Sequence, residues 1–490
     1  MIEDKAMAGQ NGLEDPTNNL SPEQPLMLHL RWVPRCLRYD HGPVEATGLA
    51  LDFYARAYIL MSSIFLGPAL LELATEAANC ESEQNCDARI YGMKPSSLLS
   101  NIAIMSGLLA SFSMPIIGAV VDHTSYRLQV GKYSGYILST VKLIEALVSS
   151  STWYYVAWLQ VLSGLFYYAH ILATYAYTSE LSDDTTEQTK YNTYFFTVLY
   201  ASTLIYMAKI LTLSNVFDQD DVGTARISQV VTGLTSGIMF IFSWTFFRNR
   251  PPTSTIPLGQ SLWTVGFHKV WKTSGEIYRT MPALKRLMGS VLFAESAMGT
   301  IVTVATTYMS TFMDMSSSEI GVVFLVVLIM GIPGAKLGEW LALKINPLTS
   351  AKICILLLLV STGLAAIVLT GPEHKHYVVI FGVLWGISMG WLHPMHTVLF
   401  LGLTPDHART EYMGIYIFCQ LVLSWLPPLV FTVLNELGVS MSIGMASLNI
   451  FFVLGLISLQ SIGRYDQLAM AVPTVVHTSG VAMVELRPIN

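Results

Sequence analysis

Apolar residues gather along the whole chain in windows of about 20 residues, the length that an α-helix needs to cross the hydrocarbon core of a bilayer. Short polar stretches separate most windows, and one long connection, residues 248–285, divides them into two sets of six. The pattern therefore predicts an all-α membrane protein with twelve transmembrane helices in two halves. We expect the spans at residues 50–74, 97–121, 133–151, 153–178, 191–213, 225–247, 286–312, 318–343, 349–370, 376–400, 411–435 and 440–462.

The composition agrees with a protein that has the bilayer as its solvent. Hydrophobic residues make up 52% of the 490 residues and charged residues only 12%, whereas about a quarter of the residues in an ordinary soluble protein are charged. The formal net charge of −6 gives no basic surface for nucleic acid. We therefore expect membrane lipid and a small-molecule substrate as partners, and no nucleic acid.

Lys and Arg residues are distributed unevenly between the two ends of the predicted spans. Nineteen lie in the tails and the even-numbered loops, and four lie in the odd-numbered loops. Because positively charged loops stay on the cytosolic side of a membrane, we expect both termini in the cytosol. Residues 1–49 are polar and lack the apolar core of a signal peptide, so we expect a disordered cytosolic tail there and a second cytosolic tail at residues 463–490.

The two halves of the chain share a short pattern at the same place. The second span ends in MPIIGAVVDHTSYR, and the corresponding part of the eighth span reads GIPGAKLGEWLALK. Each has Pro, then Gly-Ala, then an acidic residue ahead of a basic loop. This echo predicts two pseudo-symmetric six-helix bundles, at residues 50–247 and 286–462. The connection 248–285 contains the amphipathic stretch GFHKVWKTSGEIYR, which suits a helix lying on the cytosolic surface.

Ionisable side chains inside the predicted spans are candidates for function, because an isolated charge there costs roughly 2.5–3.5 kcal/mol. Glu295 and Lys209 have no oppositely charged neighbour on their own helix and need a partner from another helix or from a ligand. Three other carboxylates each have a basic residue three or four positions away on the same helix face, which can neutralise them. The pairs are Asp52 with Arg56, Lys142 with Glu145, and Lys336 with Glu339. For Lys142 with Glu145 and for Lys336 with Glu339 we favour a structural role.

If each bundle consists of two repeated triplets of helices, the first and fourth spans of each half correspond to one another, which gives spans 1, 4, 7 and 10. Titratable, aromatic and hydroxyl side chains together are typical of a cavity that holds a small polar solute. Glu295 lies roughly 14 Å into its span, near the midplane, and is our candidate for proton coupling; a protonated carboxyl that hydrogen-bonds a neighbour is the alternative. The histidines are candidates for proton relay or for hydrogen bonds between helices. The four spans carry Asp52, Arg56, Tyr58, His170, Glu295, Thr300, His393 and His396.

Sequence patterns that are typical of enzymes occur in this chain, but their positions do not suit catalysis. The sequence GISMG at Gly386–Gly390 lies within a span rather than after a strand, so it indicates a close contact between helices rather than a nucleophile motif. His393 and His396 are too few for a metal site, and the sequence contains no phosphate-binding loop. We expect no enzymatic activity, no metal and no cofactor.

Cys80 and Cys86 lie in the polar loop between the first two predicted spans. In an oxidising lumen two cysteines in one loop are candidates for a disulfide. The alternative is two free thiols, and the spacing of the residues does not decide between them.

One segment, residues 381–434, resembles the vacuolar amino-acid effluxer family of the major facilitator superfamily, the autophagy-related exporters. It reads FGVLWGISMGWLHPMHTVLFLGLTPDHARTEYMGIYIFCQLVLSWLPPLVFTVL. A Gly-rich tenth span leads there to a Pro-basic-Glu loop, then Gly-x-Tyr, then Ser-Trp-x-x-Pro. Upstream, Gly118, Asp122 and Arg127 resemble the superfamily's conformational-gate motif between spans 2 and 3. The residues matching the family's segment are Pro405, Arg409, Glu411, Gly414, Tyr416, Ser424, Trp425 and Pro428.

The chain departs from the family at two places that are expected to line the cavity. The family's first span reads Asp-Trp-Ala-Asn-Ser-Ala-Tyr, whereas residues 53–56 of this chain read Phe-Tyr-Ala-Arg. In the seventh span the family has an acidic residue and then Gly, where this chain has Ser296 and Ala297, with Glu295 one place earlier. A shift of one residue turns a helical side chain by about 100°, so the family's substrate does not transfer automatically.

The resemblance implies an alternating-access transporter that exports amino acids from a vacuole- or lysosome-like compartment to the cytosol. Beside it, we expect a monomer with proton coupling through Glu295. Asp52 and Arg56 would lie near the cytosolic mouth, where Arg56 suits a substrate carboxylate; a self-neutralised structural pair is the alternative. A proton-coupled plasma-membrane transporter of a sugar or organic anion is the second interpretation, and a non-transporting receptor or scaffold is the third. The expected substrate-binding and gating residues are Asp52, Arg56, Tyr58, His170, Thr300 and His393.

Overall fold

The structure is a computed structural model. Most of both predicted tails lies outside the residues it describes, and near the C-terminus two short strands, β1 (Val475–Val476) and β2 (Met483–Val484), pair antiparallel. Elsewhere in the described part the chain is a bundle of helices, as the apolar windows predict. The described residues are 33–39, 42–80, 86–178, 180–182, 185–252, 254–257, 259–405, 409–463, 475–476 and 483–484.

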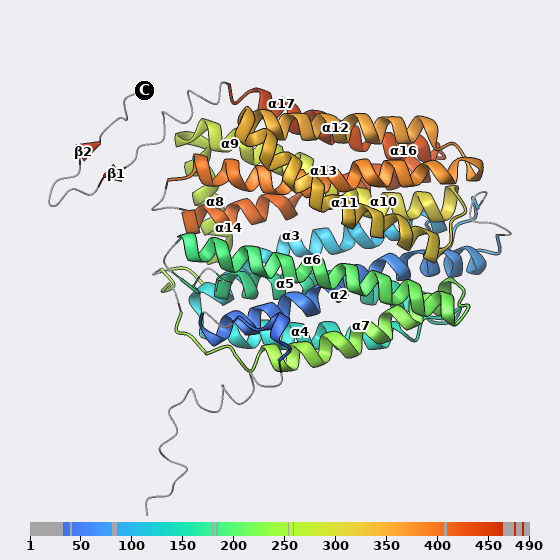
Figure 1. The fold of residues 1–490 in the computed structure, drawn as a ribbon, viewed down its shortest axis with the longest axis horizontal. Coiled ribbons are helices and arrows are strands. Elements are labelled where there is room, and N and C mark those ends of the chain that lie inside the picture. The colour runs from blue at the N-terminus through green and yellow to red at the C-terminus, as the bar shows by residue number, and fades with distance from the viewer. Residues whose placement is uncertain are drawn as a thin grey trace, which may run out of the picture.

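The helices of the first half run along the bundle in the lower part of Figure 1, in blue to green. α2 packs along α6 and α7, and α4 fits between α5 and α7. The six long helices and two short 3₁₀ helices are α2 (Val44–Ala77), α3 (Leu98–His123), α4 (Arg127–Glu145), α5 (Trp153–Thr178), α6 (Thr185–Val216), α7 (Asp221–Ser243), η1 (Arg35–Leu37) and η2 (Pro95–Ser97).

The second half lies above the first in Figure 1, in yellow to red, and the helix α8 (Leu262–Thr280) of the connection between the halves packs against α3, α9 and α14. Several spans of this half consist of two or more consecutive helices. The segments are α9 (Pro282–Ser290), the π-helical η3 (Val291–Glu295), α10 (Ser296–Thr307), the π-helical η4 (Tyr308–Phe312), α11 (Ser317–Lys344), α12 (Pro347–Val368), η5 (Pro372–Tyr377), α13 (Val378–Leu403), α14 (Arg409–Val422), α15 (Leu426–Glu436), α16 (Met441–Ala446) and α17 (Leu448–Gln460).

Within the described residues, 11 helical segments are long and apolar enough to cross a membrane. The twelfth span is α4, whose composition is too polar for that criterion but which packs inside the first half. Its predicted position, residues 133–151, lies too late along the chain. The helix already begins at Arg127, whose side chain is buried. After Glu145 the chain turns, and the carbonyl of Val148 accepts a hydrogen bond from Arg226 at 2.9 Å.

Other boundaries also differ from the apolar windows. The first span starts at Val44, directly after Pro43, rather than at residue 50. Residues 45–50 are buried because this end of α2 lies against α7, where the hydroxyl of Ser243 donates to the carbonyl of Gly48 at 2.7 Å. A hydropathy window misses this first part of the helix, because its polar and small residues are buried only where the neighbouring helix supplies their partners.

Two names describe the ends of the bundle. The linker end is where α2 begins, α17 ends and α8 lies, and the disulfide end is the opposite one, which carries Cys80 and Cys86 (Figure 1). Hydrogen bonds between the halves gather at the disulfide end. The amide of Asn435 donates to the hydroxyls of Ser96 and Ser97, both at 2.8 Å, and these bonds tie α15 to η2, directly before α3.

The closest helix contact in the second half is between α11 and α13. A Cβ atom added at Gly390 would lie 2.0 Å from the carbonyl oxygen of Gly331, and one added at Gly386 would lie 2.4 Å from that of Val327. Such distances leave room for hydrogen only. The interpretation of Gly386–Gly390 as a helix contact rather than a nucleophile motif is confirmed.

Replacement of Gly390 by Ala should lower the free energy of unfolding by about 1–3 kcal/mol, because α11 and α13 must move apart to admit the methyl group. Gly402→Ala, on the same helix, meets nothing within 4 Å and is the matched control. Since Ala favours helix over Gly, the control should be neutral or stabilising. Thermal unfolding of the detergent-purified variants measures both, and a Gly390 variant as stable as the control would refute the contact.

Candidate substrate and coupling site

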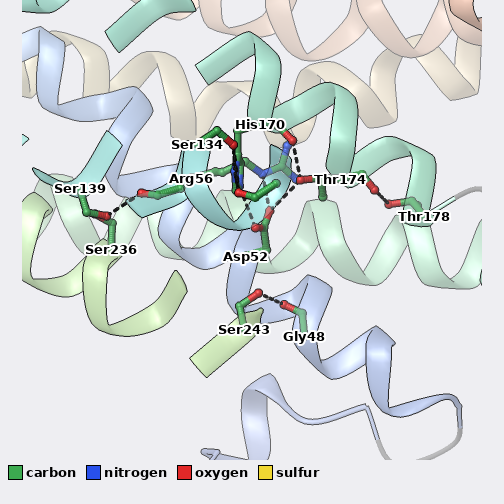
Figure 2. A network of polar contacts seen from close by, with 12 residues as sticks. Gly48, Asp52, Arg56, Ser134, Ser139, His170, Thr174, Thr178, Ser236 and Ser243 are labelled. Carbon is green, nitrogen blue, oxygen red and sulfur yellow. Dashed lines mark hydrogen bonds and ion pairs between the residues drawn. The ribbon is translucent and has the colours of Figure 1, made fainter. Parts of the chain in front are cut away.

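A fully buried polar cluster joins the helices of the first half. Asp52 on α2 faces His170 on α5, with 2.8 Å between Oδ1 and Nε2, and its Oδ2 accepts a hydrogen bond from Thr174 at 3.4 Å (Figure 2). The other ring nitrogen of His170 lies 3.0 Å from the carbonyl oxygen of Gly131 and 3.0 Å from the hydroxyl of Ser134, both on α4. The cluster therefore fixes three helices to one another.

Arg56 completes this cluster. Its Nε lies 2.9 Å from Oδ2 of Asp52, in an ion pair whose two side chains are 4% and 0% exposed. The guanidinium also lies over the ring of Phe53, at 3.8 Å from the centroid. Its Nη2 is buried and has no hydrogen-bond partner in the described part of the chain. Asp52 thus forms the predicted ion pair with Arg56 and has His170 as a second partner.

A second carboxylate–histidine cluster lies in the other half. Glu295 is the last residue of η3 and contacts His396 of α13, with 2.8 Å between Oε1 and Nδ1. Nδ1 of His393 lies 3.5 Å from the same oxygen. Ser290 contacts the far nitrogen of His396 at 3.3 Å, and the amide of Gln420 lies 3.2 Å from His393. The partner across the bundle that the sequence requires for Glu295 is thus a histidine.

The two clusters occupy corresponding places. In each half a carboxylate on the first span meets a histidine on the fourth span. They differ in exposure: Asp52 and His170 are both 0% exposed, whereas Glu295 is 7% exposed and His393 46%. The first cluster is therefore sealed within its half, whereas the second is partly exposed.

A cavity of about 420 Å³ lies between the halves, and Glu295 forms part of its wall. Of the other predicted binding residues, Thr300 lines the cavity, whereas Asp52, Arg56, Tyr58, His170 and His393 are not in its wall. Sequence reasoning missed Gln160 and Gln420, although an amide inside an apolar span is a usable signal. The polar wall residues include Ser63, Ser106, Lys142, Gln160, Ser163, Tyr167, Tyr168, Ser296, Thr300, Thr303, Thr306, Gln420 and Ser424.

The ion pairs expected within single spans have different outcomes. Lys142 and Glu145 do pair, at 2.9 Å, and both side chains are buried. Lys336 and Glu339 are both exposed, and the structure contains no salt bridge between them. Their side chains project from α11 near the linker end, where water competes for each charge, so this expected pair was wrong. Lys209 is exposed and has its ammonium 5.6 Å from the ring centroid of Tyr58, whose hydroxyl is 2.8 Å from that of Tyr54.

A sequence model of the Major Facilitator Superfamily matches residues 53–428. The chain belongs to the Major Facilitator Superfamily. No curated protein sequence matches the chain significantly. Members of this superfamily carry solutes across membranes, so the protein is a secondary transporter and not an enzyme.

Solved structures of other transporters share the fold. The nucleoside transporter NupG, as a mutant, is 10% identical with a TM-score of 0.61, over 86% of this chain and all (100%) of that one. A POT family transporter in complex with 5-aminolevulinic acid is 12% identical with a TM-score of 0.65, over 89% and 100% of the two chains. The peptide transporter POT in complex with sulfate is 12% identical with a TM-score of 0.61, over 91% and 98%. At such identities the likeness establishes the fold alone.

The residues of the expected gate motif lie at the linker end of this transporter. Asp122, at the end of α3, forms an ion pair with Lys269 of α8, with 3.0 Å between Oδ2 and Nζ. A Cβ atom added at Gly118 would lie 3.7 Å from the side chain of Leu172 on α5, an ordinary contact distance. Arg127 binds Glu180 after α5 at 2.5 Å. The motif thus connects the first half both to the linker helix and to the neighbouring loop.

A further basic residue extends this network. Arg250, after α7, binds Glu180 at 2.7 Å and also binds Glu45 at the start of α2. Burial disfavours the charged form of Arg250, but the hydrogen bond to Glu180 and the charge of Glu45 outweigh it and raise the pKa of the guanidinium. These contacts hold the ends of four helices of the first half in a fixed arrangement at the linker end.

At the disulfide end of the transporter Cys80 and Cys86 are joined by a disulfide, with 5.5 Å between their Cα atoms. The same loop continues to Arg89, which pairs with Glu436 of the second half at 3.1 Å, and to Lys94, whose backbone N–H donates to Glu436 at 2.8 Å. The bonded loop is therefore part of the contact between the halves.

Asp52→Asn should destabilise the transporter more than His170→Gln does. Without Asp52 the buried Arg56 loses the carboxylate that neutralises it, and breaking a buried pair in this way costs about 3–5 kcal/mol. Without His170 the ion pair of Asp52 with Arg56 persists. Thermal unfolding in detergent measures the order.

Glu76→Gln, the same chemical change at an exposed position of α2, is the control and should leave the unfolding temperature unchanged. Equal unfolding temperatures for Asp52→Asn and this control would mean that the buried cluster adds nothing to stability.

Proposed function

We propose that this transporter exports amino acids from a vacuole- or lysosome-like compartment to the cytosol, coupled to protons. The resemblance of residues 381–434 to the amino-acid effluxers supports the substrate class. The cavity supports it too, because its wall combines apolar surface with hydroxyl, amide and oppositely charged groups. A transporter of the same fold is solved with 5-aminolevulinic acid, a small molecule that carries both an amine and a carboxylate.

The single observation that carries the proposal is the position of Glu295 in the cavity wall with two histidines beside it. A proton taken up by Glu295 removes the charge that holds His393 and His396 against η3, so protonation and helix position are linked. His393 is 46% exposed, and in this proposal its imidazole passes protons to the carboxylate. The π-helical turn of η3 adds a residue to that turn and marks a place where a helix changes register readily.

The proposed orientation puts the linker end in the cytosol, because Lys and Arg gather in the loops at that end. The disulfide of Cys80 and Cys86 then faces the lumen, where oxidising conditions favour it. In this orientation Asn435 and Glu436 tie the two halves together at the lumenal end. Both termini are cytosolic in this arrangement, and the protein works as a monomer.

The sealed cluster of the first half has a different proposed part. Because Asp52, Arg56 and His170 fix α2, α4 and α5 to one another, the three helices move as one body when the transporter changes conformation. Tyr58 lies on the same helix, in contact with Tyr54. In this proposal the cluster transmits gating, and the cavity residues Glu295 and Thr300 meet the substrate.

The alternatives are a proton-coupled plasma-membrane transporter of a sugar or organic anion, and a receptor or scaffold that moves nothing. Uptake into proteoliposomes separates them. The assay uses a labelled mixed amino-acid pool and an imposed pH gradient, and compares the wild type with Glu295→Gln. The wild type should accumulate amino acids in response to the gradient. Glu295→Gln should lose that accumulation and keep counterflow, because a neutral amide binds no proton.

Glu339→Gln is the matched control, since this carboxylate is exposed on α11. It should behave as the wild type. Flux that ignores the pH gradient in the wild type would remove Glu295 as the coupling residue and keep the transporter. A folded protein that moves no amino acid would overturn the proposed substrate and direct the assay to sugars and organic anions.

A further inference from the structure

The cavity wall contains a charged pair that proton coupling does not use. Lys142 of α4 lines the cavity, and its ammonium donates to Oε2 of Glu145 at 2.9 Å. Gln160 of α5 donates to the same oxygen at 3.3 Å and also lines the cavity. Glu145 itself is not in the wall. Of the two charged residues of the pair, Lys142 alone therefore belongs to the cavity wall.

We infer that Lys142 binds the carboxylate of the transported amino acid; the inference rests on the proposed function and names the residue that recognises one end of the substrate. Among the described wall residues Lys142 is the one Lys or Arg side chain. Arg56, which the sequence suggests for this role, is outside the wall and already paired with Asp52. Lys209 is also outside the wall.

The hydrogen bonding of the pair is incomplete in a way that suits a ligand. An ammonium has three N–H donors, and in the described part of the chain one of them has a partner, Glu145. Lys142 is 1% exposed, and buried donors are normally satisfied. Oε1 of Glu145 is also buried without a hydrogen-bond partner. A purely structural pair buried this deeply is expected to have its remaining donors and acceptors filled.

A substrate carboxylate would supply the missing acceptors. It brings two oxygens to Lys142 and to the amide of Gln160, and charge-assisted hydrogen bonds of this kind are strong where water is excluded. In the empty cavity Glu145 keeps the lysine neutralised, so no uncompensated charge is buried between transport cycles.

The opposite charge in the wall comes from the other half. Glu295 belongs to the second half and Lys142 to the first, and both line the same cavity. A zwitterion with its carboxylate at Lys142 and its ammonium toward Glu295 contacts both halves at once. A molecule that lacks the carboxylate loses the contact with the first half, so amino acids should be distinguished from the corresponding amines and amides.

Competition in proteoliposomes tests this role. Counterflow of a labelled mixed amino-acid pool is competed by the same unlabelled pool or by a pool of the corresponding amino-acid amides, which keep the side chain and amine and lose the carboxylate charge. In the wild type the amides should compete about tenfold more weakly or worse, as expected for the loss of a charge-assisted hydrogen bond. In Lys142→Gln the KM for amino acids should rise by about tenfold and the preference over amides should vanish.

Two further variants keep the result interpretable if Lys142→Gln leaves Glu145 unpaired and folds poorly. Lys142→Gln/Glu145→Gln removes the pair without leaving a buried charge and should also lose the preference, whereas Lys142→Arg should retain it. Lys336→Gln, at an exposed position of α11, is the control for loss of a lysine.

The outcomes separate this inference from the function on which it rests. A folded double variant with wild-type KM and wild-type preference for amino acids over amides would overturn the role of Lys142 and leave amino-acid export standing. A folded wild type that takes up none of the amino-acid pool would overturn the proposed function and this role together.

Discussion

The cost of an unpaired charge away from water governs the interior of this transporter. A carboxylate buried between membrane helices must find a partner, and the two carboxylates on the first spans of the halves find it in the same way, in a histidine of the fourth span: Asp52 with His170, and Glu295 with His396. Because each such pair joins two helices, the helices of a half are held in a definite arrangement. The cavity and the contacts between the halves are built on these arrangements.

The two clusters have the same design and different surroundings. Asp52 is shared between His170 and Arg56, and all three side chains are buried, so this cluster is suited to hold helices together. Glu295 lies in the cavity wall beside the half-exposed His393, so this is the cluster to which the proposed function assigns proton exchange. A repeated architecture thus gives one half a rigid polar core and the other a chemically accessible one. The same residue types serve both, and exposure distinguishes them.

Membership of the Major Facilitator Superfamily accounts for the helices and the transport function, and the chemistry of the cavity wall has to account for the substrate. The wall places a basic group from the first half and an acidic group from the second around about 420 Å³. The proposed zwitterionic substrate uses both of these charges. The departures of residues 53–56 from the effluxer pattern also become intelligible, because Arg56 extends the buried cluster and does not line the cavity.

The sequence by itself determined the number of spans, their division into two halves and the residues that carry charge into the membrane, because hydropathy and spacing along a helix are local properties. It also identified the pair Lys142 and Glu145, which lie three residues apart on one helix face. The tertiary structure decided which charges meet. Glu295 and His396 are far apart in the chain, and only the packing of η3 against α13 brings them within 2.8 Å. The same packing decided that Glu295, Lys142 and Gln160 line the cavity while Asp52 and Arg56 do not, because burial depends on neighbouring helices whose positions no local pattern records.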